Sequence, residues 1–222
     1  MFDAVLFDLD GTLADTAPDL GATLNKLLAE EGQPTQALTF LRAYTSQGVR
    51  GLLRAGFGMA PSHPDYERLG QRFLEIYAEN LCRETLLFEG VSELLDALEE
   101  LGLRWGIVTN KRTRFTDPLV RLLSLVPRTN CVVSGDTTPE AKPSPLPILH
   151  ACQLLDCQPQ RTLYVGDDLR DILAGRTAGC LTVAASYGYL GDSGSPDTWG
   201  ADLIIDHPKD LTIFLTERLS GS

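Results

Sequence analysis

Cysteine, positive charge and long apolar runs are all scarce in this 222-residue sequence, and each shortage excludes a class of protein. The five cysteines are odd in number and contain no CxxC pair, which argues against a disulfide framework and a zinc site and favours a reducing cytoplasm. No apolar run approaches the roughly 18 residues that a membrane helix needs. Because the first residues lack a basic flank and soon reach acidic ones, we expect no signal peptide and a cytoplasmic location.

The balance of charge argues against two kinds of partner. Only 19 lysines and arginines oppose 30 aspartates and glutamates, so the formal net charge is −11. This excess repels nucleic acid and anionic membranes, and we expect neither as a partner. A small anionic substrate stays compatible with it if cations gather at the binding site. The sequence leaves the oligomeric state, monomer or homodimer, open.

Short apolar runs alternate with helical patterns along most of the chain. The helical segment 91–102 carries four leucines on one stripe. Strands that alternate with helices predict an α/β fold, a Rossmann-like parallel sheet with helices on both faces. Ligands of such sheets bind at the carboxyl ends of the strands, so the polar ends of these runs are a candidate site. The expected strands are residues 3–8, 105–110, 130–135, 162–167, 181–186 and 201–206.

A helical insertion interrupts this alternation. Nearly a hundred residues separate the first two expected strands, and we find no strand-like run among them. Thr16 is the expected N-cap of the first inserted helix, with Pro18 in its first turn. We predict a helical domain over residues 15–84, and a sheet domain over residues 1–14 and 85–222. Helical patterns cover residues 17–31, 35–44, 49–56 and 67–81.

The first expected strand runs into two carboxylates, Asp8 and Asp10, followed by Gly11 and Thr12. Two carboxylates so close together repel each other, bind a divalent cation, or divide into a nucleophile and a proton carrier. Taken alone, this fragment also fits an ordinary Asp-Gly turn on the surface.

Two further fragments carry hydrogen-bond donors. Thr109 and Asn110 follow a strand and are able to donate to an oxyanion, although a helix cap explains them equally well in isolation. Lys142 precedes a proline that fixes the backbone after it. Its alternative interpretation is a solvated surface lysine.

An acidic cluster follows the run TLYV: Asp167 and Asp168, with Asp171 a little further on. Such a cluster is costly unless a cation lies there, although acids at a helix N-terminus are the alternative. Because all four fragments fall at expected strand ends of one sheet, we expect them to meet. Together they supply the carboxylates, hydroxyl and lysine of Mg²⁺-assisted phosphoryl transfer.

In their order along the chain, the four fragments resemble the signature of the haloacid dehalogenase-like hydrolase superfamily. That signature is DxDGT at the first strand, Ser or Thr after the second, a Lys often followed by Pro, and an acidic GD motif. The resemblance spans residues 8–171. A dehalogenase of this superfamily does not use the second aspartate of DxDGT for proton transfer and needs no Mg²⁺, so the intact motif indicates phosphate chemistry.

This resemblance implies a mechanism and a metal site. Asp8 would be the nucleophile that forms an aspartyl-phosphate, and Asp10 would protonate the leaving group and then activate water. Mg²⁺ would be held by Asp8, by the backbone carbonyl of Asp10 and by Asp167. Asp168 departs from the Ser or Thr often found at its position, so its direct contact with the metal stays open.

The same resemblance assigns the groups that hold the substrate. Thr109 and Lys142 would bind the phosphoryl oxygens as charge shifts in the transition state. Asn110 and the backbone amides near Gly11 would assist them. Asp171 would orient the groups around the metal.

The helical insertion matches the place of a mobile cap in this superfamily. Within it, we expect glycine-flanked Arg50 to pair with a substrate anion, against the alternative of a solvated side chain. The sequence looks most like the phosphoglycolate phosphatases through VTNK (108–111), AKPSP (141–145) and VGDDLRDILAGRTAGC (165–180). The run GDDLRDI, together with PDTWGADLIIDHP, also resembles N-acetylmuramic acid 6-phosphate phosphatases.

We therefore expect a Mg²⁺-dependent hydrolase of a small phosphorylated metabolite, 2-phosphoglycolate first and N-acetylmuramic acid 6-phosphate second. A sugar-phosphate mutase shares every motif and stays a rival. A phospho-receiver signalling module is disfavoured because DxDGT lies at the first strand and the acidic cluster comes late. A catalytically inactive binding module is disfavoured because no catalytic position is missing.

Overall fold

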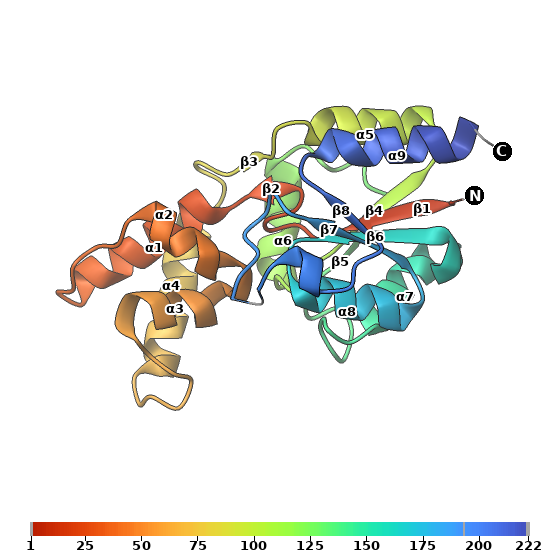
Figure 1. The fold of residues 1–222 in the computed structure, drawn as a ribbon. Helices are drawn as coiled ribbons and strands as arrows, with labels where there is room; N and C mark the ends of the chain where they lie inside the picture. Colours follow the sequence, from red (N-terminus) through yellow and green to blue (C-terminus); the bar gives the residue numbers. More distant parts are fainter. Residues whose placement is uncertain (1, 193, 221–222) are drawn as a thin grey trace.

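The computed structural model describes residues 2–192 and 194–220, which form a sheet lobe and a helical lobe (Figure 1). The strands of the main sheet are β1 (Ala4–Phe7), β4 (Arg104–Val108), β5 (Cys131–Val133), β6 (Thr162–Gly166), β7 (Leu181–Ala185) and β8 (Leu203–Ile205). They pair in parallel in the order β5-β4-β1-β6-β7-β8. The parallel α/β sheet predicted from the sequence is confirmed.

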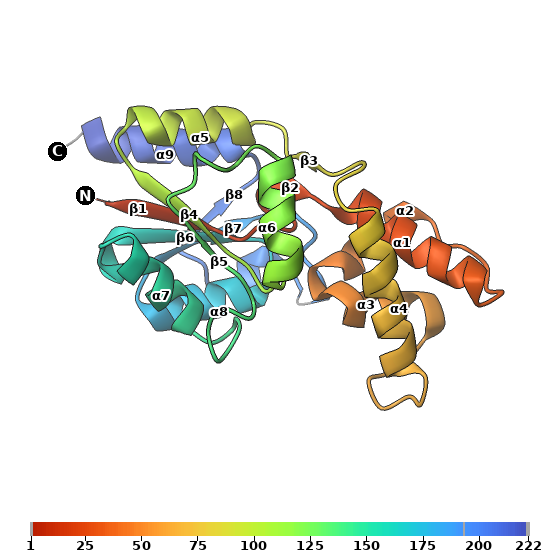
Figure 2. The ribbon, with the colours of Figure 1, turned by 180° about the vertical axis from the view of Figure 1, so that it is seen from behind.

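Helices cover both faces of this sheet (Figures 1 and 2). In both views α5 and α9 lie along one face, and α7 and α8 lie along the other. Among the described residues, no helix combines the length and apolar character needed to cross a membrane. The helices of the sheet lobe are α5 (Val91–Glu100), α6 (Thr113–Leu122), α7 (Leu146–Leu154), α8 (Leu169–Ala178) and α9 (Pro208–Ser220), with the 3-10 turns η2 (Pro159–Arg161) and η3 (Pro196–Thr198).

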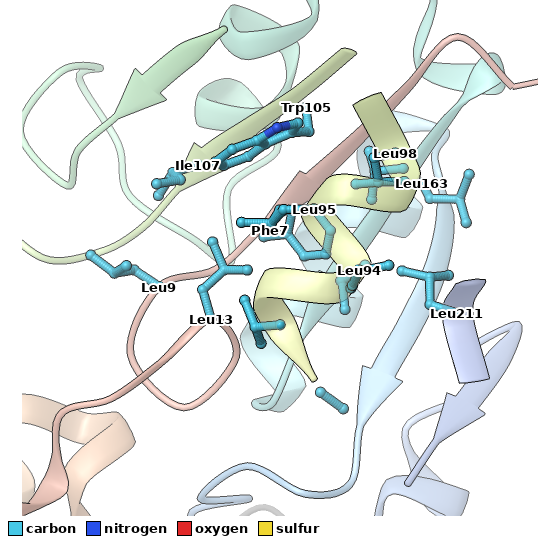
Figure 3. Packing of buried hydrophobic residues seen from close by; sticks show 14 of the residues in the cluster. Phe7, Leu9, Leu13, Leu94, Leu95, Leu98, Trp105, Ile107, Leu163 and Leu211 are labelled. Carbon is cyan, nitrogen blue, oxygen red and sulfur yellow. The ribbon is translucent and has the colours of Figure 1, made fainter. Parts of the chain in front are cut away.

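Strand β1 is apolar throughout because it is buried on both faces. Successive side chains of a strand point to opposite faces, so Val5 and Phe7 join the cluster under α5 and α9. Ala4 and Leu6 join the cluster under α7 and α8. Burying each large apolar side chain of this kind stabilises the fold by about 1.5–3 kcal/mol. Figure 3 shows the first cluster, with Phe7, Trp105 and Ile107 on strands and Leu94, Leu95 and Leu98 on α5.

The helical lobe has an apolar core of its own and lies beside the carboxyl end of β1 (Figure 1). Leucines of its first helix and Phe73 and Ile76 of its last helix are fully buried together. Its elements are α1 (Ala17–Glu30), α2 (Leu38–Leu41), the 3-10 helix η1 (Arg42–Gln47), α3 (Gly48–Phe57) and α4 (Tyr66–Glu79).

Two local expectations were wrong, and a third was confirmed in position only. The chain between the first two expected strands does contain strands, because β2 (Ala14–Asp15) pairs antiparallel with β3 (Leu86–Leu87) at the base of the helical lobe. Two residues are too few to produce an alternating pattern. The helix expected over 35–44 ends at Leu41 and continues as the 3-10 helix η1. Thr16 occupies the N-cap position of α1, as expected, but its side chain makes no capping hydrogen bond because its hydroxyl donates to Asp10 Oδ1.

Candidate active site

The polar fragments expected at strand ends lie on three neighbouring strands. Asp8 follows β1, Thr109 follows β4 and Asp167 follows β6, and β1 is hydrogen-bonded between the other two. On one side of β1 the sheet continues to β4 and β5, and on the other side to β6, β7 and β8. The carboxyl ends of the central strands therefore form the topological switch point, where ligands of α/β sheets bind. The strand order thus brings polar residues that are far apart in the sequence into one site.

Lys142 is a buried cation at the centre of the site. Its Nζ donates to Val108 O at 2.9 Å, to Tyr164 Oη at 2.8 Å and to Asp171 Oδ1 at 2.6 Å. Burial opposes the charge, but the carboxylates of Asp171 and Asp8 outweigh it and raise the pKa of Lys142 above its ordinary value. The side chain is therefore a fixed positive charge at the strand ends.

Asp8 forms an ion pair with this lysine. Its Oδ1 lies 2.9 Å from Lys142 Nζ, yet this buried oxygen receives no aligned hydrogen bond from any described residue. An ammonium group has three N–H donors, and those of Lys142 are taken by its other partners. Lys142 therefore holds Asp8 by charge where Asp8 lines the cavity.

Asn110 holds the backbone of Lys142. Its Nδ2 donates to Lys142 O, and its Oδ1 accepts from Lys142 N, both at 2.9 Å. These two hydrogen bonds use both the NH₂ group and the oxygen of the side-chain amide. The structure thus gives Asn110 a role in positioning the lysine, in addition to lining the cavity beside Thr109.

Three carboxylates, including that of Asp8, converge at the strand ends. One oxygen from each of Asp8, Asp167 and Asp171 lies within 4.8 Å of the others. Burial and then the charges of Asp8 and Asp171 raise the pKa of Asp167 well above its usual range. An all-oxygen, negatively charged cluster of this kind suits a hard divalent cation such as Mg²⁺, whose charge offsets the repulsion between the carboxylates. The donor set therefore fits the metal expected from the sequence.

Asp168 lies outside that cluster. Its Oδ1 accepts from Arg170 N at 2.9 Å and from Arg170 Nε at 2.8 Å, which caps α8. Asp171 completes the capping box because its Oδ2 accepts from Asp168 N. Asp171 therefore contacts Lys142 and the carboxylate cluster, whereas Asp168 pairs with Arg170.

Gly11 allows the loop after β1 to pass directly over Asp167. Its φ is +91°, and a Cβ at this position would lie 2.1 Å from Asp167 Oδ2. The next residue, Thr12, donates its hydroxyl to Asp167 Oδ1 at 3.2 Å. Tyr189 N donates to Asp167 Oδ2 at 2.8 Å from the opposite loop. Glycine is needed here for both conformation and space.

We expect Gly11→Ala to lower the free energy of unfolding by about 2–5 kcal/mol, from the backbone conformation and from overpacking. It should also remove activity, because Asp167 is displaced. Gly32→Ala is the matched control, since Gly32 has φ +68° but its Cβ would meet no described atom within 4 Å, chain neighbours aside. Urea denaturation of that control should show a loss of only about 1–2 kcal/mol. Equal losses in the two variants would contradict the close approach to Asp167.

Asp10 has two partners that the sequence interpretation did not include. Thr16 Oγ1 donates to Asp10 Oδ1 at 2.6 Å, which explains why its side chain makes no capping hydrogen bond to α1. Lys111 Nζ lies 2.9 Å from the same oxygen. The signals for Lys111 in the sequence are its place directly after Thr109 and Asn110 and its presence in the run VTNK (108–111).

A cavity of about 970 Å³ lies between the two lobes, and the site residues that line it are Asp8, Asp10, Thr109, Asn110, Lys142 and Asp171. This volume is near the upper end of the roughly 300–1,000 Å³ typical of small-molecule pockets. Exposed Arg50 lines it from α3, and within residues 2–192 and 194–220 we find no ion-pair partner for its guanidinium. Cations gather here despite the net charge of −11. The other basic residues that line the cavity are Arg68, Lys111, Arg112, Arg114, Lys142 and Arg170.

The helical lobe contacts the carboxylate cluster directly. Ser46 Oγ, in η1, donates to Asp167 Oδ2 at 3.3 Å. Arg170 Nη2 donates to Ser46 O at 2.7 Å. Ser46 and Arg170 also line the cavity.

Comparisons with known proteins agree with this geometry. The chain matches the haloacid dehalogenase-like hydrolase family over residues 5–185. A protein of Pseudomonas putida named N-acetylmuramic acid 6-phosphate phosphatase is 42% identical over 218 residues, 98% of both chains. A protein of Xanthomonas campestris pv. campestris named phosphoglycolate phosphatase is 43% identical over 212 residues, 94% of both chains.

A solved structure extends the agreement to the fold. The crystal structure of a predicted phosphoglycolate phosphatase from Haemophilus somnus superimposes with a TM-score of 0.85 at 28% identity. The match covers 96% of this chain and 98% of that one. The chain belongs to the haloacid dehalogenase-like hydrolase family, as its ordered motifs predict, and it is a phosphatase.

Proposed function

We propose that the enzyme hydrolyses small phosphomonoesters through an aspartyl-phosphate on Asp8. The observation that carries this proposal is that Asp8 lines the same cavity as Thr109 and forms an ion pair with the buried Lys142, whose Nζ lies 2.9 Å from Asp8 Oδ1. Asp8 attacks phosphorus, and the ester P–O bond breaks as the new one forms. Asp10 protonates the leaving alkoxide, then takes a proton from the water that attacks phosphorus. Inorganic phosphate leaves and Asp8 is restored.

Thr109 and Lys142 hold the phosphoryl oxygens during both displacements. Thr109 Oγ1 accepts from Lys111 N at 3.2 Å, so its own proton is free for an anion. Lys142 contributes a buried charge, worth more in a low-dielectric site than in water. Backbone amides beside Gly11 complete the set.

We propose Asp8, Asp167 and the backbone carbonyl of Asp10 as ligands of Mg²⁺. When bound, the metal neutralises charge between the attacking carboxylate and the phosphate. Asp171 pairs with Lys142 and orients it, while Asp168 acts through Arg170. The convergence of three carboxylate oxygens within 4.8 Å supports this assignment.

The helical lobe is proposed to act as a cap over residues 15–84, with residues 1–14 and 85–222 as the phosphatase core. The Ser46 contact with Asp167 and the cavity between the lobes support it. A cap of this kind excludes water from the reaction and completes the substrate site. The thiols of all five cysteines are free, which is consistent with work in the cytoplasm.

The first candidate substrate is 2-phosphoglycolate. Its carboxylate suits the exposed guanidinium of Arg50 at the cavity wall, which has no ion-pair partner among the described residues. The Xanthomonas relative, which covers 94% of the chain, bears the name of that activity.

A second candidate is N-acetylmuramic acid 6-phosphate. This sugar phosphate also bears a carboxylate, and it fills more of a cavity of about 970 Å³ than 2-phosphoglycolate does. Apolar and aromatic side chains of the helical lobe, including Tyr66, Phe73 and Leu74, line the same cavity. The Pseudomonas relative bears the name of this activity.

Both substrates belong in one panel of phosphomonoesters, assayed with Mg²⁺ and with EDTA. We expect phosphate release with Mg²⁺ and at least about a hundredfold loss with EDTA, because the carboxylate cluster then lacks its cation. The ratio of kcat/KM for the two candidates decides between them. Activity that survives EDTA, or none on any phosphomonoester, would overturn the proposal.

A further inference from the structure

Lys111 connects the two lobes at Asp10. It follows the end of β4 in the sheet lobe, and its Nζ lies 2.9 Å from Asp10 Oδ1. The same ammonium donates to Tyr77 Oη of α4 at 3.2 Å. It also lies 4.9 Å from the centre of the Tyr77 ring. One side chain thus contacts a carboxylate of the sheet lobe and an aromatic ring of the helical lobe.

This contact is buried and charged. The Lys111 side chain is 9% exposed and the Asp10 side chain is 15% exposed. Burial opposes the positive charge, but Asp10 and Tyr77 raise the pKa of Lys111 above its ordinary value. The contact is therefore shielded from water and weakly screened by salt.

The backbone of Lys111 is fixed by the sheet lobe. Its N–H donates to Thr109 Oγ1 at 3.2 Å, and its carbonyl accepts from Gly135 N at 2.8 Å and from Thr116 Oγ1 at 3.1 Å. Tyr77 belongs to α4 and packs on Phe115, with ring centroids 5.4 Å apart. An outward movement of α4 would therefore remove Tyr77 from an ammonium that stays with the sheet.

Both partners of Asp10 bind the same oxygen. Thr16 Oγ1 and Lys111 Nζ lie 2.6 Å and 2.9 Å from Oδ1. Within the described part of the chain, no hydrogen bond reaches Oδ2, and Asp10 lines the cavity. The carboxylate is thus held by one oxygen, and the other is left for a proton on the substrate side.

We propose that Lys111 is a positioning residue that holds Asp10 for proton transfer and is itself held by Tyr77 when the helical lobe is closed. This inference rests on the proposed role of Asp10 as acid and base. Proton transfer requires heavy atoms about 2.6–3.2 Å apart, so a displaced carboxylate is a poor acid even when the substrate is bound. The contact makes Asp10 competent only after the cap closes over a substrate.

The test uses leaving groups that differ in their need for a proton. p-Nitrophenolate leaves unprotonated, whereas the alkoxides of 2-phosphoglycolate and glycerol 2-phosphate need a general acid. We expect Lys111→Met to lower kcat/KM for both alkyl phosphates by about a hundredfold, and for p-nitrophenyl phosphate by less than about fivefold. Glycerol 2-phosphate is included because it has no carboxylate that Lys111 could bind.

Tyr77→Phe is the second variant, because it keeps the ring and removes only the hydroxyl. It should reproduce the same selectivity with a smaller loss, about fivefold for the alkyl phosphates. Lys26→Met is the matched control, since the half-exposed Lys26 pairs with Glu79 at 3.6 Å in the helical lobe. Its kcat/KM should stay unchanged for all three compounds, and thermal unfolding checks that each variant is folded.

Two outcomes would overturn the inference. An equal loss for all three compounds would make Lys111 a phosphate-binding or structural residue, and a loss confined to 2-phosphoglycolate would make it a ligand of the carboxylate. Asp10→Asn separates these outcomes from failure of the proposed function. If Asp10→Asn still hydrolyses glycerol 2-phosphate normally, the proposed mechanism itself is wrong. If Asp10→Asn is inactive, only the role of Lys111 is in question.

Discussion

Replacing Asp8 by asparagine is expected to lower kcat for every phosphomonoester by at least about ten-thousandfold. An amide oxygen is a poor nucleophile, and we expect no other carboxylate to take the place of Asp8 beside Lys142 and Thr109. The substitution is nearly isosteric and removes one negative charge from the cluster with Asp167 and Asp171. The protein should therefore stay folded, with a melting temperature equal to that of the parent or higher.

Asp3→Asn provides the control for this variant. Asp3 lies at the opposite end of β1 from Asp8 and pairs with Arg161, whose side chain is 48% exposed. Steady-state phosphate release by Asp3→Asn should equal that of the parent enzyme. Near-normal turnover by Asp8→Asn, in enzyme free of parent protein, would contradict the assignment of Asp8 as nucleophile.

Lys142→Met is expected to have the largest effect on stability. Removing one partner of a buried ion pair costs about 3–5 kcal/mol, because the remaining charge is buried without compensation. Here Asp8 and Asp171 would both lose the cation, and the hydroxyl of Tyr164 would lose a donor. Activity should also fall by at least about a thousandfold, since the phosphoryl oxygens lose their buried charge.

Stability and activity can be separated with a second substitution. Asp171→Asn removes one of the stranded charges, so the double variant should recover part of the lost free energy of unfolding without recovering activity. Lys209→Met, at an exposed lysine of α9, is the neutral control. Urea denaturation measures the free energies. A Lys142→Met variant as stable as the parent would show that the carboxylates do not depend on this lysine.

The parts of the site that were predictable from sequence are those with a local pattern. DxDGT, Thr109, Lys142 and Asp167 each follow or precede an apolar run, and parallel strands bring their carboxyl ends together. That reasoning needs only the order of strands and helices. The same reasoning predicted the parallel sheet and the helical insertion.

Contacts between distant segments were not predictable in this way. Lys111 gains its significance from Tyr77, which lies 34 residues earlier in the chain on another lobe. Thr16 has the residue type and the position of an N-cap, yet its hydroxyl donates to Asp10 and not to the backbone of α1. Strands β2 and β3 are too short to leave a pattern. In each case the local sequence is compatible with more than one structure, and a tertiary contact determines which one forms.

The central claim, a covalent phosphoryl group on Asp8, can be measured directly. Borohydride reduces an acyl phosphate of aspartate to homoserine, which mass spectrometry locates in the peptide. Enzyme quenched during turnover with Mg²⁺ and then reduced should contain homoserine at position 8, and enzyme without substrate should not. Homoserine at another aspartate, or none while turnover continues, would contradict the mechanism.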